Sequence, residues 1–309
     1  MQAFFEGKYV DMADARVSVM THALNYGTGV FEGIRGYWNS EEEQLLLFRV
    51  REHFERIHRS ARIVRINIPY TVDELVDICA NVVRSGNFRE DVYVRPLAYK
   101  SALQIGLSMI VGGPDEPRLV DDDFTLFAVP FGNYLDIEKP IRCTIASWRR
   151  VNDNMIPARA KVTGVYINSS MAKTEAVEAG FDEAIMLTHD GHVSEGTGEN
   201  LFVVRDNRLV TPSVSEDVLE GITRSTIIQI ARDELGLETV ERPMDRTELF
   251  IADELFLVGT GAQISPVSEI DGRIIGDGHI GAVTRALQDL YFDIVRGRQS
   301  AYRKWCMSV

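Results

Sequence analysis

The stretch ARAKVTGVYINSSMAKTEAVEAGF, residues 158–181, is the starting point for the architecture. It carries two lysines among small, apolar and hydroxyl residues. Lys161 stands shortly before Gly164, whereas Lys173 lies in a segment typical of a helix. Most lysines lie at the surface, so an exposed loop charge is the first interpretation of Lys161. If Lys161 is buried instead, desolvation lowers the pKa of its amine, as a Schiff-base lysine requires.

The segments around this stretch indicate an α+β fold. Helical and strand patterns alternate without a strict βαβ rhythm, which argues against a doubly wound sheet. Pro96 inside a β-branched and aromatic run predicts a strand near an edge or a bulge. The expected helices are 51–64, 71–86, 164–180 and 221–236, and the expected strands include 91–100, 124–131, 142–148 and 253–259, with a meander over 181–212.

Glycine and proline bracket a polar run, GNYLDIEKP, at residues 132–140. Such a run is typical of a domain junction. We therefore expect a smaller N-terminal domain, 1–131, and a larger C-terminal domain, 141–309, which carries Lys161.

Composition excludes several classes of protein. The formal net charge of −13 argues against a nucleic-acid partner, because binding phosphates requires clustered Lys and Arg. The apolar runs are too short to cross a bilayer, and the N-terminus does not resemble a signal peptide. Three scattered cysteines form neither a metal-ligand spacing nor a disulfide framework. These features favour a cytoplasmic protein without a membrane partner or a bound metal.

Three further segments break the ordinary pattern. SEGTGENLFVV, 194–204, places Glu195 and Glu199 just before an apolar strand, where a carboxylate needs a partner unless it lies in a solvated turn. LEGITRSTIIQIARDELG, 219–236, begins a helix with bare N–H groups, which suits an anion but equally describes a capped helix. VGTGAQISPV, 258–267, flanks Thr260 with glycines and is either an anion-binding turn or only a turn.

Together the four segments suit one ligand. A lysine amine, a carboxylate and two turns suited to phosphate are the groups that pyridoxal phosphate (PLP) requires. The amine holds the aldehyde, the carboxylate holds the pyridinium nitrogen, and backbone amides with an arginine hold the phosphate.

At these segments the sequence resembles the branched-chain amino acid aminotransferases of the class IV, or fold-type IV, PLP enzymes. The pieces HALNYGTGVFEGIR, REHFERIHRSA, VYVRPLAY, KVTGVYINS, SEGTGENLF, GITR and GTGAQISPV occur in the family's order along nearly the whole chain. The resemblance implies two α/β domains with the cofactor at their interface, and a homodimer or hexamer with pockets completed by the partner subunit. The implied reaction is ping-pong transamination of L-leucine, L-isoleucine or L-valine with 2-oxoglutarate.

The resemblance also implies roles for cofactor-binding residues. Lys161 matches the lysine that forms the internal aldimine and shuttles the substrate proton, whereas Lys173 is expected to be an ordinary helix residue. Glu195 matches the acid at the pyridine nitrogen, and Glu199 is left as a structural acid. Tyr166 matches the residue at the phenolic oxygen, Leu219 packs on the ring, and the implied phosphate contacts are Arg56, Ile222, Thr223 and Thr260.

The substrate pocket is implied in the same way. Arg95 is the expected partner of the second carboxylate of glutamate, and it must tolerate an apolar substrate in the same pocket. The other implied pocket residues are Tyr26, Phe31, Gly33, Tyr93 and Tyr134, with Gly261 and Ala262 offering N–H groups to the α-carboxylate. The chain departs from many members at Phe131, Gly261 and Gln263, which leaves the substrate range open.

Other activities share this scaffold. A transaminase for D-amino acids or (R)-amines is the first alternative, and Tyr93 and Arg95 count against it. A lyase acting on an aminodeoxychorismate-like substrate and an inactive PLP-binding protein are further alternatives.

Overall fold

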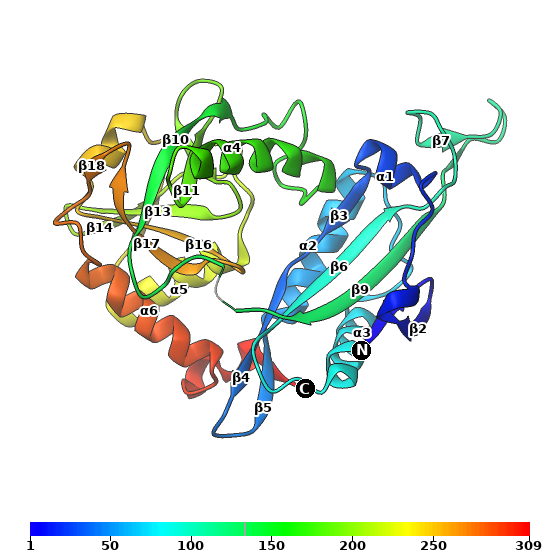
Figure 1. Cartoon of the computed structure of the whole chain (residues 1–309), viewed down its shortest axis with the longest axis horizontal. Helices are drawn as coiled ribbons and strands as arrows, with labels where there is room; N and C mark the ends of the chain where they lie inside the picture. The colour runs from blue at the N-terminus through cyan, green and yellow to red at the C-terminus, as the bar shows by residue number, and fades with distance from the viewer. Residues whose placement is uncertain (133) are drawn as a thin grey trace. The chain divides into compact units, whose positions relative to one another are not determined.

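The computed structural model describes residues 1–132 and 134–309 (Figure 1). The described chain forms two compact units. Unit 1 comprises Met1–Gly132, Ala160–Val165 and Val295–Val309, and unit 2 comprises residues 134–159 and Tyr166–Ile294. The domain limits 1–131 and 141–309 stay a prediction. The structure adds that two later segments, Ala160–Val165 and Val295–Val309, pack with the N-terminal residues.

Unit 1 is built on an antiparallel sheet of eight strands in the order β19-β5-β4-β6-β9-β1-β2, with β3 also paired to β6. Its strands are β1 (Gln2–Phe5), β2 (Lys8–Asp11), β3 (Gly29–Phe31), β4 (Ile34–Asn39), β5 (Gln44–Phe48), β6 (Val92–Lys100), β9 (Asp122–Pro130) and β19 (Cys306–Ser308). A separate pair is formed by β7 (Ile110–Val111) and β8 (Arg118–Leu119). The helices are η1 (Met12–Asp14), α1 (His22–Tyr26), α2 (Val50–Ile63), α3 (Val72–Gly86), η2 (Thr163–Val165) and η4 (Ser300–Trp305).

The two longer helices of unit 1 confirm the predicted periodicity. In α2 the apolar residues Phe54, Ile57 and Ala61 are buried. At the start of α3, Thr71 accepts from the Glu74 N–H while the Glu74 carboxylate accepts from the Thr71 N–H, a complete capping box. Helix α3 packs on β1 and β9, and α2 packs on α3 and β3.

Strand β6 is interior to the sheet, so of the two predicted alternatives, an edge or a bulge, the edge position was wrong. It pairs with β9 on one side and with β3 and β4 on the other. Proline lacks an N–H, and Pro96 lies opposite the interruption between β3 and β4, where its carbonyl accepts from the Glu32 N–H at 2.9 Å. The break in the neighbouring strands therefore accommodates the proline in a central strand.

Unit 2 is built on a mixed sheet of nine strands in the order β12-β11-β10-β17-β16-β13-β14-β15, with β18 paired to β17. Its strands are β10 (Ile141–Arg149), β11 (Glu183–Leu187), β12 (Val193–Gly196), β13 (Asn200–Arg205), β14 (Arg208–Thr211), β15 (Thr239–Glu241), β16 (Glu254–Gly259), β17 (Gln263–Ile270) and β18 (Arg273–Ile274). The helices are α4 (Tyr166–Glu178), α5 (Ile222–Leu235), η3 (Arg246–Ile251) and α6 (Ala282–Val295, reaching one residue into unit 1).

The sheet of unit 2 lies between helices. Helix α4 packs on β10 and β11, and α5 packs on β15 and β16; Figure 1 shows α4 on one face and α5 with α6 on the other. Ile185, Leu201, Leu257 and Ile270 are fully buried in its core. The helices and strands predicted in this half are confirmed, whereas α6 lies outside the predicted segments. None of the described helices combines the length and apolar character that a membrane-crossing helix requires.

Candidate active site

Lys161 is anchored in unit 1 between β3 and α2. Its carbonyl oxygen accepts from the Phe31 N–H at 3.0 Å, and its own N–H donates to Ser60 Oγ at 3.2 Å. The side chain is half-buried, and its ammonium nitrogen lies 4.9 Å from the centroid of the Phe31 ring. The aromatic face attracts the cation. Lys161 is therefore held against the sheet and does not extend from an exposed loop.

Two glycines allow this segment to approach the connection between α1 and β3. Gly27 has a φ of +66°, and a Cβ atom on it would lie 2.7 Å from Gly164 Cα. The Gly164 N–H and the Thr163 hydroxyl both donate to the Gly27 carbonyl, at 3.2 and 2.8 Å. The backbones can come this close only because neither glycine carries a side chain. The residues after Lys161 are thus fixed to the N-terminal part of the unit.

Arg56 lies on α2 in a buried stripe of polar residues, with His53 before it and Ser60 after it. Its Nε and Nη2 donate to the two carboxylate oxygens of Glu32, at 2.7 and 2.8 Å. His53 Nδ1 lies 2.7 Å from Glu32 Oε2. Burial opposes charge on Glu32, but Arg56 and His53 outweigh it and lower the pKa of the carboxyl far below its usual range.

The predicted substrate residues Phe31, Gly33, Tyr93 and Arg95 lie together on unit 1. The Arg95 guanidinium carbon stands 4.4 Å from the Phe31 ring centroid, and Nη2 donates to Tyr93 Oη at 3.0 Å. A Cβ atom on Gly33 would lie 2.0 Å from that same oxygen, so Tyr93 takes this position because residue 33 is glycine. The ring of Phe131 lies 5.0 Å from the ring of Tyr93. The structure thus joins an apolar ring, a tyrosine hydroxyl and a cation.

Tyr26 is the last residue of α1, and its contacts described next are with other residues than Phe31, Tyr93 or Arg95. Its ring lies 4.7 Å from the His22 ring, and its hydroxyl accepts from the Gly106 N–H at 3.0 Å. It ties α1 to the loop after β6.

Glu195, on β12 of unit 2, is buried and receives several donors. Arg150 Nη2 lies 2.8 Å from Oε1, while the Asn200 amide and the Leu219 N–H donate to Oε2, both at 3.0 Å. These donors match an ionised carboxylate. A cationic pyridinium N–H would be a further partner for such an anion, so the surroundings of Glu195 fit PLP.

The start of α5 carries Ile222 and Thr223. Gly221 is the N-cap residue, and no side chain caps the helix. A Cβ atom on Gly221 would lie 2.0 Å from Asn200 Oδ1, the amide group that also contacts Glu195. The first N–H groups of a helix have no intrahelical acceptor and favour an anion. The turn therefore fits the phosphate of PLP.

The second turn connects β16 to β17. Gly259 pairs with Gln263, and Gln263 has a positive φ of 59°. Thr260 and Gly261 are half-buried, and Ala262 is buried with its carbonyl accepting from the Ser265 hydroxyl at 2.9 Å. A Cβ atom on Gly261 would lie 3.6 Å from Tyr134 Cβ. Gly261, Ala262 and Tyr134, three predicted pocket residues, thus lie on one side of unit 2.

Tyr166 begins α4, and Lys173 lies further along the same helix. Lys173 is not an ordinary solvated residue, because its Nζ donates to the Glu183 carboxylate at 2.7 Å and lies 5.5 Å from the Tyr134 ring centroid. Burial, with nearby Glu183, raises the pKa of Glu199 to about 8. Lys173 is therefore a half-buried cation beside two buried acids, Glu183 and Glu199.

Sequence reasoning missed four buried residues that contact the predicted site. The first two are Glu32, which precedes Gly33 in FEG, and Asn200, which follows Glu199. For both, the available signal was a polar residue within an apolar run. His53 lies one turn before Arg56, and helical spacing could have found it. Arg150 has no local signal, because it is distant from Glu195 in the sequence.

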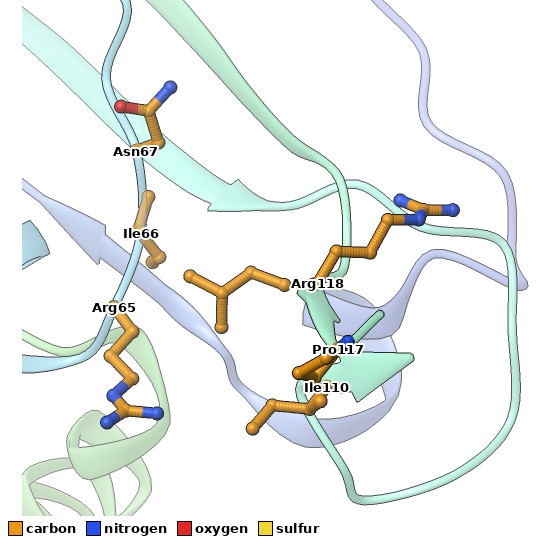
Figure 2. A pocket seen from close by; sticks show the side chains of 7 residues that line it. Arg65, Ile66, Asn67, Ile110, Pro117 and Arg118 are labelled. Carbon is orange, nitrogen blue, oxygen red and sulfur yellow. The ribbon is translucent and has the colours of Figure 1, made fainter. Parts of the chain in front are cut away.

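A hollow of about 440 Å³ in unit 1 contains none of the predicted site residues. It lies between the segment 65–67 and the β7–β8 pair, and Ile66, Ile110 and Leu119 line its apolar part. Figure 2 shows the Arg118 side chain extending away from Arg65. The two cations do not converge on a common point, so this hollow does not resemble the expected cofactor site.

Comparison with known proteins places the chain in a family. A model of the amino-transferase class IV family matches residues 29–270. The chain belongs to the class IV aminotransferases. The resemblance drawn from the sequence and the α+β fold class are thereby confirmed.

Members of this family cover the chain almost completely. The probable branched-chain-amino-acid aminotransferase of Aquifex aeolicus is 47% identical, over 99% of this chain and 96% of its own length. The crystal structure of a branched-chain aminotransferase from Thermoproteus uzoniensis with norvaline is 45% identical, with a TM-score of 0.93, covering 100% of this chain and 99% of its own. The branched-chain amino acid aminotransferase of Thermobaculum terrenum, in PLP-form, is 36% identical with a TM-score of 0.90, over 99% and 97% of the chains.

Proposed function

We propose that the protein is a branched-chain-amino-acid aminotransferase. It transfers the amino group of L-leucine, L-isoleucine or L-valine to 2-oxoglutarate, giving branched 2-oxo acids and L-glutamate in a ping-pong cycle. The observation that carries this proposal is the full-length similarity, at 45–47% identity, to enzymes named for this activity. The cofactor is PLP, which supplies an electron sink for the carbanion when bound.

Lys161 is the proposed catalytic residue. With PLP bound, its amine would hold the cofactor aldehyde, and after the substrate amine has displaced it there, it would carry the proton at the substrate α-carbon. Its place beside the Phe31 ring supports this role, because the ring attracts the ammonium group, 4.9 Å from the ring centroid, and holds it within unit 1. Its anchored backbone fixes the point from which the side chain extends.

The other cofactor residues have electrostatic tasks. Glu195 keeps a proton on the pyridine nitrogen, and Tyr166 donates to the phenolic oxygen. Leu219 packs on the pyridine ring of the cofactor. The bond from its N–H to Glu195 holds Leu219 and Glu195 in place relative to each other. For the phosphate we propose the guanidinium of Arg56 and the turns that carry Ile222, Thr223 and Thr260.

The proposed substrate pocket must accept both an apolar chain and a carboxylate. Burial of a leucine side chain contributes about 1.5–3 kcal/mol, and Phe31 offers an apolar surface. Arg95 pairs with the second carboxylate of glutamate. Its contacts with Phe31 and Tyr93 supply partners when that carboxylate is absent, so the cation is not left buried alone. Gly33, Tyr26 and Tyr134 shape the walls, and Gly261 and Ala262 offer N–H groups to the α-carboxylate.

Self-association is part of the proposal. Large apolar side chains are exposed around α1 and the loop after β6, among them Val19 at 80% and Leu107 at 81% exposure. Tyr26 joins these two regions through Gly106. Such a patch is typical of a protein interface. Light scattering should give the mass of a dimer or hexamer, and Leu107→Asp should shift it toward the monomer; a monomeric parent protein would contradict the proposal.

We propose a cytoplasmic location, supported by three buried free cysteines, Cys79, Cys143 and Cys306. Cell fractionation tests it, and recovery with a periplasmic or extracellular marker would contradict it.

The reaction is tested by half-reactions on the purified yellow protein. We expect L-leucine to bleach the visible absorption rapidly, and 2-oxoglutarate to restore it. D-alanine and (R)-phenylethylamine serve as matched amino donors of the opposite configuration. Bleaching by either of these, with none by L-leucine, would replace the proposal by a D-amino acid or (R)-amine transaminase.

Specificity has its own test in Arg95→Gln. We expect a loss of about ten- to a hundredfold in kcat/KM for L-glutamate, with less than threefold for L-leucine, because only glutamate offers a second carboxylate. Equal losses for both substrates would show that Arg95 does not discriminate between them.

A further inference from the structure

The contact between Glu32 and Arg56 is a buried, two-pronged ion pair. Glu32 is 0% exposed and Arg56 is 5% exposed. The Nε and Nη2 edge of the guanidinium faces both carboxylate oxygens, at 2.7 and 2.8 Å. Two parallel bonds between planar groups fix the plane of the arginine as well as its position. A single carboxylate therefore sets the direction in which this cation points.

His53 completes the arrangement. It lies one helical turn before Arg56, and its Nδ1 is 2.7 Å from Glu32 Oε2. Burial lowers the pKa of His53, and because a carboxylate oxygen can only accept, the ring donates its Nδ1–H to Glu32. The Glu32 carboxylate accepts from Arg56 and His53, both on α2. Rotation of Glu32 away from Arg56 would break these three contacts.

The Glu32–Arg56 pair is not needed to fix the backbone between β3 and β4. The connection between β3 and β4 is already fixed by the bond from the Glu32 N–H to the Pro96 carbonyl, at 2.9 Å. A buried ion pair is weak evidence for stability, since apolar residues of similar volume often stabilise a fold as well. The orientation of Arg56 is what the carboxylate adds.

The same face of α2 connects this group to the proposed catalytic residue. Ser60 lies one turn after Arg56, and its hydroxyl oxygen accepts from the Lys161 N–H at 3.2 Å. One rigid helix therefore carries His53, Arg56 and Ser60, which contact Glu32 or Lys161. An error in the direction of Arg56 would displace a bound phosphate relative to Lys161.

We propose that Glu32 is a positioning residue for the cofactor: it aims the Arg56 guanidinium at the phosphate of PLP, and His53 holds Glu32 in place. This inference rests on the proposed role of Arg56. It assigns the buried acid of FEG a function in selecting a phosphorylated cofactor. Glu32 itself makes no contact with the cofactor.

The test compares PLP with pyridoxal, which lacks the phosphate. Each is titrated by visible absorption into the full chain after removal of its cofactor. Glu32→Gln places an amide N–H₂ against the donors of Arg56, and we expect the affinity for PLP to fall about ten- to a hundredfold while that for pyridoxal changes less than threefold. Glu32→Asp shortens the acid and should lose less. His53→Leu should weaken PLP binding, and His53→Asn, which keeps a donor near the Nδ1 position, should restore most of it.

Asp122→Asn is the matched control. It breaks a buried ion pair of the same unit, the one between Asp122 and Lys100 at 2.8 Å, outside the predicted site. We expect it to lower the thermal midpoint without changing the preference for PLP over pyridoxal. If Glu32→Gln lowers the affinity for both cofactor forms equally, or for neither, the positioning role is wrong.

Arg56→Gln separates this inference from the role on which it rests. Loss of the PLP preference in Arg56→Gln, with none in Glu32→Gln, would overturn the positioning role alone. If Arg56→Gln keeps the preference, the proposed phosphate contact of Arg56 is wrong, and the role of Glu32 is overturned with it.

Discussion

In unit 1 the two candidate site arginines are held by other side chains, whereas in unit 2 the two candidate anion-binding turns are built around glycines. Arg56 is oriented by Glu32, and Arg95 by Tyr93. In unit 2, Gly221 begins α5 without a side-chain cap. We infer that side chains of unit 1 set the direction of the cations, whereas turns of unit 2 offer backbone N–H groups to an anion.

The largest expected effect concerns Lys161, in unit 1. Lys161→Ala should abolish the yellow colour and reduce L-leucine turnover about 10⁴-fold or more, because it removes both the nucleophile and the proton carrier. Lys173→Ala, in unit 2, should lower stability but keep the visible absorption, since its ammonium pairs with Glu183. Absorption spectra and turnover measure both. Retained turnover in Lys161→Ala would refute its catalytic role.

Substitutions of Glu195 test the negative charge that unit 2 is proposed to place at the pyridine nitrogen. Glu195→Gln should reduce turnover roughly 10²-fold, because the amide cannot hold the pyridine nitrogen protonated and leaves Arg150 without its buried partner. Glu195→Asp should recover part of the loss. Turnover is measured at saturating PLP, so that weaker cofactor binding does not mimic the effect. Unchanged turnover in Glu195→Gln would remove Glu195 from the proposed mechanism.

A pair of glycine variants tests the comparison directly. Gly33→Ala should displace Tyr93 and the bond to Arg95, raising KM for L-glutamate about tenfold with little change in PLP affinity. Gly221→Ala should displace Asn200 and weaken PLP binding about tenfold, with little change in the ratio of glutamate to leucine activity. A tenfold change corresponds to about 1.4 kcal/mol, which lies within the roughly 1–3 kcal/mol typical of overpacking. If Gly33→Ala weakened PLP binding and Gly221→Ala changed the ratio of glutamate to leucine activity, the comparison between the two units would be wrong.

Two buried glutamates affect the pH dependence of unfolding, with opposite signs. Burial raises the pKa of Glu199 to about 8 from an ordinary 4.5, so its contribution to stability is present below pH 4.5 and is lost as the pH rises toward 8. The pKa of Glu32 is lowered, so its contribution is present above pH 4.5 and is lost only in acid. The free energy of unfolding, measured between pH 5 and 8, should fall as the pH rises. Its slope is at most about 1.4 kcal/mol per pH unit for one proton. Glu199→Gln should flatten that slope, and an unchanged slope would contradict the assignment.

The sequence predicted the local elements well, because their signals are local. The predicted helices 51–64 and 71–86 match α2 and α3. The position of β6 in the sheet was predicted wrongly, since nothing near Pro96 indicates that β3 and β4 are interrupted opposite it. Strand order depends on contacts between distant segments.

The family, the cofactor and Lys161 as the candidate nucleophile followed from the sequence alone, because motifs record the chemistry of individual residues. Only the tertiary structure revealed Glu32 with Arg56, Arg150 with Glu195, and Lys173 with Glu183. It also placed Ala160–Val165 with the N-terminal residues. Each depends on burial, where a charge needs a partner that is close in space at any distance along the chain. Sequence patterns identify groups able to react, and packing decides which charges hold them in position.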